Sequence, residues 1–215
     1  MKQKTDRNIY EVPKISIEKI LNSGTYPQAL KIKDKTKLRI LVDTSSIKHI
    51  PLDHKGQALF CHKAEDGKPY QIYMTHRGVR EMNNNSHLIP WQLKNYMYSI
   101  SKRVIDARYE PQDYKEITEW HEEWRQDKDK KPISVADIKL LSTGMRWARR
   151  DEQTILLADD MDILSGVSYL RKKSPERKIF KEHMLAIPLA KAINSLYEIK
   201  PQKFPIWIYP DKSVN

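Results

Sequence analysis

The sequence predicts an α/β fold, in which strands and helices alternate along the chain. Three short runs of mostly apolar residues that include β-branched ones, at 38–42, 71–75 and 154–158, indicate buried strands. The segments between them place apolar residues at helical spacing. Strands that are joined by helices pair in parallel through right-handed crossovers, so we expect a mainly parallel sheet. A length of 215 residues is sufficient for one domain with a sizeable core.

Turn-forming residues bound each predicted strand. Polar residues directly follow the first and third strands, and an Asp-Gly-Lys-Pro turn signal at 66–69 precedes the second. A further segment at 204–209 contains one proline and is followed by another. Because proline lacks the N–H that a central strand needs, this segment suits only an edge strand.

Helical periodicity predicts six helices, of which the first is a short amphipathic piece. The predicted helices span residues 15–21, 78–82, 91–107, 114–124, 134–149 and 181–197. The predicted organisation is a basic N-terminal extension at 1–36, a single domain at 37–212 with a helical insertion around 108–131, and a tail at 213–215.

Charge is distributed unevenly along the chain. The whole sequence has 39 basic and 28 acidic residues, a net charge of +11 and a pI of about 9.5. The stretch 106–131 holds nine acidic and six basic residues, so the remainder carries +14. A positive field of this size favours a polyanionic partner such as nucleic acid, although a basic protein without such a partner has the same composition.

The single cysteine, Cys61, cannot form an internal disulfide, which is typical of a reducing, cytoplasmic compartment. The charged N-terminus is not followed by an apolar signal region, and no apolar run approaches the length of a membrane span. We therefore expect a cytoplasmic protein without a membrane partner.

Acidic residues follow the predicted strands. Asp43 comes directly after the first strand, and Asp159, Asp160 and Asp162 follow the third. The carboxyl ends of parallel strands meet at one edge of a sheet, where α/β proteins bind ligands. Glu81 lies one helical turn after the second strand, and Asp137 lies at the start of the predicted helix 134–149. Each acid also has a purely structural interpretation: Asp43 as a turn residue, Glu81 as a solvated helix acid, Asp159, Asp160 and Asp162 as loop or capping residues, and Asp137 as part of a capping box.

Several carboxylates at one sheet edge repel one another, and some would have to take up protons. A hard divalent cation removes this conflict, because Mg²⁺ and Mn²⁺ prefer carboxylate and water oxygens. A metal held by acids within a basic surrounding is typical of sites that hydrolyse phosphodiester bonds.

Four segments in this order and spacing resemble the PIN-domain nucleases. They are LVDTSSI at 41–47, IYM at 72–74 with VREM at 79–82, ADIKLLSTG at 136–144, and ILLADDMDI at 155–163. The resemblance implies a three-layer α/β/α sandwich and a Mg²⁺- or Mn²⁺-dependent endoribonuclease that cuts single-stranded or structured RNA with metal-activated water. It also implies an RNA partner, a possible antitoxin-like or ribonucleoprotein partner, and a possible homodimer.

The resemblance assigns roles to particular residues. The catalytic acids fall on Asp43, Glu81, Asp137 and Asp160, and Asp162 matches an accessory acid; the metal ligands would be Asp43, Asp137, Asp160 and Asp162. Ser45 matches a small hydroxyl residue near the metal, and we count it among the residues expected to contact RNA. From the charge pattern we add the basic residues on either side of the third strand as RNA contacts, namely Arg146, Arg149, Arg171, Lys172 and Lys173.

Two other functions remain open. A PIN-like protein can bind RNA or assist ribonucleoprotein assembly without cutting, and keep its acids for folding. A histidine-based cyclising ribonuclease would instead need a histidine pair, for which His49, His62 and His76 are available. Loss of cleavage in the variant Asp43→Asn separates the metal nuclease from both.

Overall fold

The computed structural model describes residues 15–22, 30, 32, 37–53, 55–64, 66–84, 88–104, 110–124 and 132–198. Within these residues, a five-stranded and entirely parallel sheet has the strand order β5-β4-β2-β6-β7. Its strands are β2 (Arg39–Val42), β4 (Gln71–Thr75), β5 (Ser101–Val104), β6 (Thr154–Leu157) and β7 (Met184–Ile187). Two short strands, β1 (Ile15–Ser16) and β3 (Phe60–Cys61), form a separate parallel pair.

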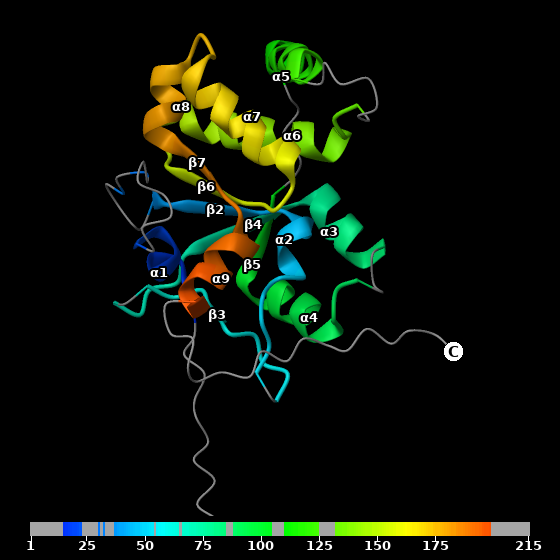
Figure 1. The fold of residues 1–215 in the computed structure, drawn as a ribbon, viewed down its shortest axis with the longest axis vertical. Helices are drawn as coiled ribbons and strands as arrows, with labels where there is room; N and C mark the ends of the chain where they lie inside the picture. The colour runs from blue at the N-terminus through cyan, green and yellow to red at the C-terminus, as the bar shows by residue number, and fades with distance from the viewer. Residues whose placement is uncertain are drawn as a thin grey trace, which may run out of the picture.

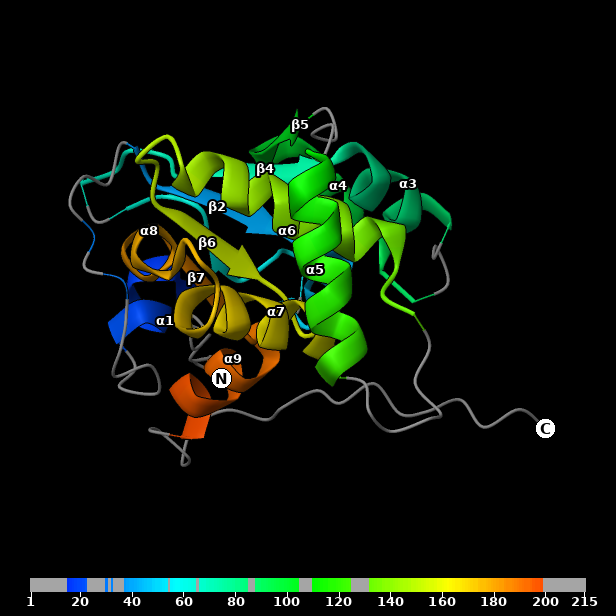
Figure 2. The same ribbon diagram turned by 90° about the horizontal axis from the view of Figure 1, so that it is seen from above.

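Helices cover both faces of the sheet (Figures 1 and 2). One face carries α1 (Ile17–Asn22), α2 (Thr44–Ile47), α3 (His76–Asn84), α4 (Trp91–Ile100) and α9 (Leu189–Glu198). The other carries α5 (Pro111–Trp124), α6 (Val135–Ala148), α7 (Met161–Lys172) and α8 (Arg177–His183). The predicted α/β class and three-layer arrangement around a parallel sheet are confirmed.

Each central strand contributes side chains to two separate cores. In β2, Ile40 and Val42 belong to one hydrophobic cluster, while Leu41 between them belongs to the other. In β6, Ile155 and Leu156 divide in the same way. A strand buried on both faces needs apolar residues at every position, which explains why these strands read as continuous apolar runs. The predicted strands at 38–42, 71–75 and 154–158 therefore match the observed ones within one residue at each end.

Two strands lie where the sequence predicts helix, and both predictions are wrong. Strand β5 occupies part of the predicted helix 91–107: the hydroxyl of Ser101 donates to the carbonyl of Met97 (2.6 Å), which ends α4, and the chain then pairs with β4. Strand β7 occupies part of the predicted helix 181–197. Its residues are good helix formers, but pairing with β6 and burial between two layers outweigh that propensity, and Pro188 follows directly. The predicted edge strand at 204–209 lies outside the described residues.

Residues 15–22, assigned by the sequence to the N-terminal extension, are part of the domain. Ile15 pairs with Phe60, and the side chains of Ile17 and Ile20 are fully buried in the same core as β2. The reason is the hydrophobic effect. The segment has three isoleucines within six residues, and their burial in the core is more favourable than their exposure to water on an extension. Residues 1–14 and the tail 213–215 lie outside the described residues.

The predicted insertion around 108–131 contains one described helix, α5, which lies against α6 and α7 (Figure 2). Ile117 and Trp120 on α5 are buried in the core formed by these helices. Helix α5 is therefore a packed part of the outer layer. No helix among the described residues has the length and apolar character required to cross a membrane.

Gly166 lies where α7 packs tightly against side chains of α5 and α6. A Cβ atom placed there would lie 2.9 Å from a methyl carbon of Leu141 and 3.2 Å from the ring of Trp120. We expect Gly166→Ala to destabilise the protein by about 1 kcal/mol. The added methyl group would cost about 2 kcal/mol through overpacking, whereas alanine gains only about 1 kcal/mol in helix propensity. Urea unfolding checks this, with Ser168→Ala on the exposed side of α7 as the control; a gain in stability for Gly166→Ala would contradict the close packing.

Candidate active site

The sheet has a topological switch point between β2 and β6. The chain runs from β2 outward through β4 to β5, and then returns to the other side of β2 with β6 and β7. Connections leave the carboxyl ends of β2 and β6 in opposite directions, which opens the space beyond these two strand ends and makes it the usual ligand site of an open α/β sheet. Asp43 follows β2, and Asp159 and Asp160 follow β6.

Asp43 is fixed by the first turn of α2. Its backbone N–H donates to the carbonyl of Leu157 (2.9 Å), which ties it to the end of β6. Its carboxylate accepts the backbone N–H of Ser45 (3.1 Å) and the Ser45 hydroxyl, and so caps α2. Burial raises the pKa of Asp43, the bonds from Ser45 oppose the rise, and the negative charge of Asp160 adds to it.

Asp160 and Asp162 are placed by the first turn of α7. Asp160 is the N-cap residue, and its carboxylate accepts the backbone N–H of Asp162 (2.7 Å). Asp162 lies in the first helical turn, where the helix dipole favours a negative charge. Both residues therefore lie just past the carboxyl end of β6, at the first turn of α7.

Asp137 comes to the same place from another element. Ser134 caps α6 by accepting the backbone N–H of Asp137 (3.1 Å), so the capping interpretation of this pair is correct. The Asp137 carboxyl is also buried near other carboxylates. Burial raises its pKa to about 7, and the charges of Asp160, Asp43 and Asp162 contribute to the rise. The structure therefore brings Asp43, Asp137, Asp160 and Asp162 into one group, which we call the acidic cluster.

Ser45 connects the ends of the two central strands. Its hydroxyl donates to Asp43 and accepts the backbone N–H of Asp159 (3.1 Å). Asp159 in turn accepts the backbone N–H of Ala190, at the start of α9, with one carboxylate oxygen (2.9 Å). Its other oxygen is buried and has no hydrogen-bond partner among the described residues. Ser45 thus orients Asp43, and Asp159 anchors α9 beside the cluster.

Glu81 lies at the edge of the acidic cluster. Its carboxylate accepts the hydroxyl of Thr44 at 3.1 Å, so α3 brings it next to the residue that follows Asp43. The charges that act on Asp43 and Asp137 come from aspartates of the cluster itself. Glu81 is therefore a neighbour of the cluster and touches it through Thr44.

The chemistry of the acidic cluster fits a hard divalent cation. All four members offer carboxylate oxygens, which Mg²⁺ and Mn²⁺ prefer. Burial and mutual repulsion raise the pKa of Asp43 and Asp137, and a cation among them would relieve both effects. No three His, Cys, Asp or Glu side chains of the described ranges already stand in a metal-coordinating arrangement, so the carboxylates would turn toward a shared ion.

The basic residues proposed from the charge pattern do not surround the acidic cluster. Helix α6 starts near it with Asp137, but Arg146 lies nine positions further on, or about 13 Å at 1.5 Å per residue. Helix α7 starts with Asp160 as its cap and ends at Lys172, so Arg171, Lys172 and Lys173 are at its far end. These five cations, Arg149 included, lie toward the opposite edge of the sheet.

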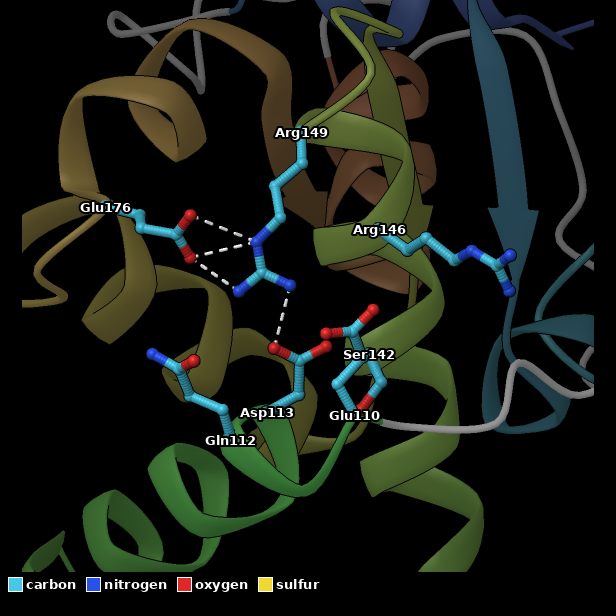
Figure 3. A pocket seen from close by; sticks show the side chains of 7 residues that line it. All are labelled: Glu110, Gln112, Asp113, Ser142, Arg146, Arg149 and Glu176. Carbon is cyan, nitrogen blue, oxygen red and sulfur yellow. Dashed lines mark hydrogen bonds and ion pairs between the residues drawn. The ribbon is translucent and has the colours of Figure 1, made fainter.

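Arg149 also has partners inside the protein (Figure 3). Its guanidinium contacts Asp113 at 2.7 Å and forms a two-pronged interaction with Glu176, in which Nε lies 2.9 Å from one carboxylate oxygen. Asp113 is buried, and Arg149 is mostly so. The group borders a small polar cavity of about 170 Å³ between α5, α6 and α8. Arg149 therefore joins α5 to the domain and is held by two carboxylates that RNA phosphate would have to displace.

Other cations belong to the helices that begin at the carboxyl ends of the strands, and the charge pattern of the sequence did not select them. Lys48 ends α2, Arg80 precedes Glu81 on α3, and Lys191 follows Ala190 on α9; all three are exposed. Each lies four to six residues past the end of a strand, on the same side of the sheet as the residues that follow the strands directly.

The fold and the acidic cluster together define an α/β protein with a carboxylate site at the topological switch point of a parallel sheet. No family model matches the chain, and no curated protein and no solved structure matches it.

Proposed function

We propose that this protein is a Mg²⁺- or Mn²⁺-dependent endoribonuclease of the PIN type, acting in the cytoplasm. The observation that carries the proposal is the acidic cluster at the switch point, where burial and mutual repulsion raise the pKa of Asp137 to about 7. A group of carboxylates that destabilise one another is costly to a fold that does not use them, and perturbed carboxyls of this kind are enriched at functional sites. The segments that resemble PIN nucleases contribute all four aspartates.

In this proposal Asp43, Asp137 and Asp160 would bind the cation with Asp162 as an accessory ligand, and Glu81 would assist through water. A divalent ion at this position lowers the pKa of a water molecule and offsets charge on the scissile phosphate. Ser45 holds Asp43 in place, and the capping bonds of Ser134 and Asp160 fix the other carboxylates on rigid helix ends. The chemistry needs no nucleophilic side chain from the protein.

The test is cleavage of single-stranded RNA in Mn²⁺ by the wild-type protein and by Asp43→Asn. We expect cleavage by the wild type and a loss of about 100-fold or more in the variant, since several kcal/mol of charge stabilisation disappear. Equal rates would refute the metal nuclease. Activity in excess EDTA would favour the histidine-based alternative, and RNA binding without cleavage would favour the non-catalytic one.

The positions of the cations give a second prediction. We expect the triple variant Lys48→Ala, Arg80→Ala, Lys191→Ala to bind single-stranded RNA about tenfold more weakly and with a shallower salt dependence, because each phosphate contact contributes about 0.7 to the logarithmic slope. The matched control is Arg146→Ala, Lys172→Ala, Lys173→Ala, which removes the same charge at the opposite edge. Fluorescence anisotropy over a salt series measures both. A larger loss in the control would restore the RNA contacts predicted from the charge pattern.

A further inference from the structure

Helix α5 lies in the connection between β5 and β6 and contributes a residue that contacts the acidic cluster. Its first turn is held by the ion pair between Asp113 and Arg149, and its middle by the burial of Ile117 and Trp120. Trp120 also meets Gly166 on α7, only four residues after Asp162. The following residue, His121, lies next to Asp162 in the first turn of α7. Figure 2 shows α5 beside α7.

The ring of His121 is enclosed by aromatic side chains. Its centroid lies 5.7 Å from those of both Trp120 and Trp124, and only 2% of the residue is exposed. Its Nε2 atom lies 3.6 Å from a carboxylate oxygen of Asp162. This distance is within the range of an ion pair and slightly longer than a direct hydrogen bond. The two tryptophans thus leave the ring little freedom and direct its nitrogen at the accessory acid.

Packing alone does not account for a histidine at this position. A buried imidazole costs free energy unless its nitrogens have polar partners, whereas leucine or phenylalanine would fill an aromatic enclosure without that cost. The Nε2 atom of the His121 ring has the carboxylate of Asp162, a member of the acidic cluster, as its polar neighbour. The carboxylate of Asp162 acts in turn on Asp137, whose pKa it helps to raise.

We propose that His121 is a positioning residue, which holds the carboxylate of Asp162 toward the acidic cluster and so strengthens binding of the divalent cation. This inference rests on the proposed function, because it assigns to α5 a part in the same site. His121 touches Asp162 and does not itself touch the cation or the RNA. Partners of metal ligands in this position commonly change metal affinity tenfold or more when they are removed.

A pair of variants separates positioning from packing. His121→Leu keeps an apolar side chain between the tryptophans and removes the nitrogen, whereas His121→Gln keeps an N–H donor close to the position of Nε2. Ile117→Val is the control, because it removes a methyl group from the buried face of α5 and leaves the histidine and both tryptophans in place. Isothermal titration of the full chain with MnCl₂ gives the dissociation constant of each protein, and thermal unfolding in EDTA gives its stability.

We expect His121→Leu to weaken Mn²⁺ binding about tenfold and His121→Gln to recover most of that loss. Ile117→Val should lower the melting temperature and leave the Mn²⁺ dissociation constant unchanged. If the wild type binds Mn²⁺ and His121→Leu has the same dissociation constant, the role of His121 is overturned while the proposed function stands. No Mn²⁺ binding by the wild type would overturn both, and equal losses in the leucine and glutamine variants would assign His121 to packing.

Discussion

Replacing Asp137 with asparagine is expected to stabilise the metal-free protein and to abolish RNA cleavage. The folded protein raises the pKa of Asp137 from the ordinary value of 3.8 to about 7, chiefly by burial and then by the charges of Asp160, Asp43 and Asp162. Ionisation of this buried carboxyl therefore lowers the free energy of unfolding of the metal-free protein. The same carboxylate is a proposed cation ligand, so its removal should cost about 100-fold or more in cleavage rate.

The pH dependence of this effect has a defined sign. Between pH 3.8 and about 7 the folded protein retains a proton that the unfolded chain releases, so Asp137 lowers stability progressively as the pH rises through this window. The difference between the pKa of 3.8 in the unfolded chain and about 7 in the folded protein corresponds to about 4 kcal/mol of unfolding free energy, at 1.36 kcal/mol per pKa unit. We expect Asp137→Asn to gain about half of that at pH 8, because asparagine loses the favourable charge at the start of α6 and is itself polar.

Unfolding by urea in EDTA at pH 8 and at pH 4 measures this gain. The difference between Asp137→Asn and the wild type should be large at pH 8 and close to zero at pH 4. Asp151→Asn is the matched control, because Asp151 is exposed and has a φ of 59°, a conformation that asparagine adopts readily. A destabilised Asp137→Asn at pH 8 would show that the acidic cluster does not strain the fold.

The second large effect concerns Arg149. This side chain joins Asp113 on α5 to Glu176 before α8, and its guanidinium also lies over the ring of Phe180. Asp113 is 2% exposed, so removing Arg149 leaves a buried carboxylate without its partner. We expect Arg149→Met to lower the free energy of unfolding by about 3 kcal/mol or more at pH 7.

The double variant Arg149→Met, Asp113→Asn should recover much of this loss, because it removes the uncompensated charge together with its partner. Arg146→Met is the control on the same helix, since Arg146 is exposed. Chemical denaturation of the four proteins provides the comparison. An equal, small effect of Arg149→Met and Arg146→Met would mean that α5 docks without this ion pair, and would restore Arg149 as a candidate RNA contact.

The sequence predicts the centre of this fold well because the central strands are buried on both faces. Only continuous apolar runs satisfy that environment, and β2, β4 and β6 are such runs. Strands β5 and β7 are missed because their residues also suit a helix, and only pairing with β4 and β6 decides between the two structures. Local propensity carries no information about that pairing.

The candidate site divides in the same way. Asp43 and Asp160 are found from sequence because a residue that follows a parallel strand must lie at one edge of the sheet. The cations at 171–173 are placed wrongly relative to these acids, because a helix of twelve residues carries the chain about 18 Å away from the strand end. His121 carries no sequence signal, since its contact with Asp162 depends on how α5 docks against α7.

The central claim, that the acidic cluster binds a divalent cation, is tested most directly by thermal unfolding in a Mn²⁺ titration. A ligand at a hundred times its dissociation constant stabilises a protein by about 2.7 kcal/mol, which raises the melting temperature of a chain of this size by about 5–10 °C. We predict such a rise for the wild type and for Asp151→Asn, and its absence in Asp160→Asn. A melting temperature of the wild type that Mn²⁺ and Mg²⁺ leave unchanged, or an equal rise in Asp160→Asn, would contradict the claim.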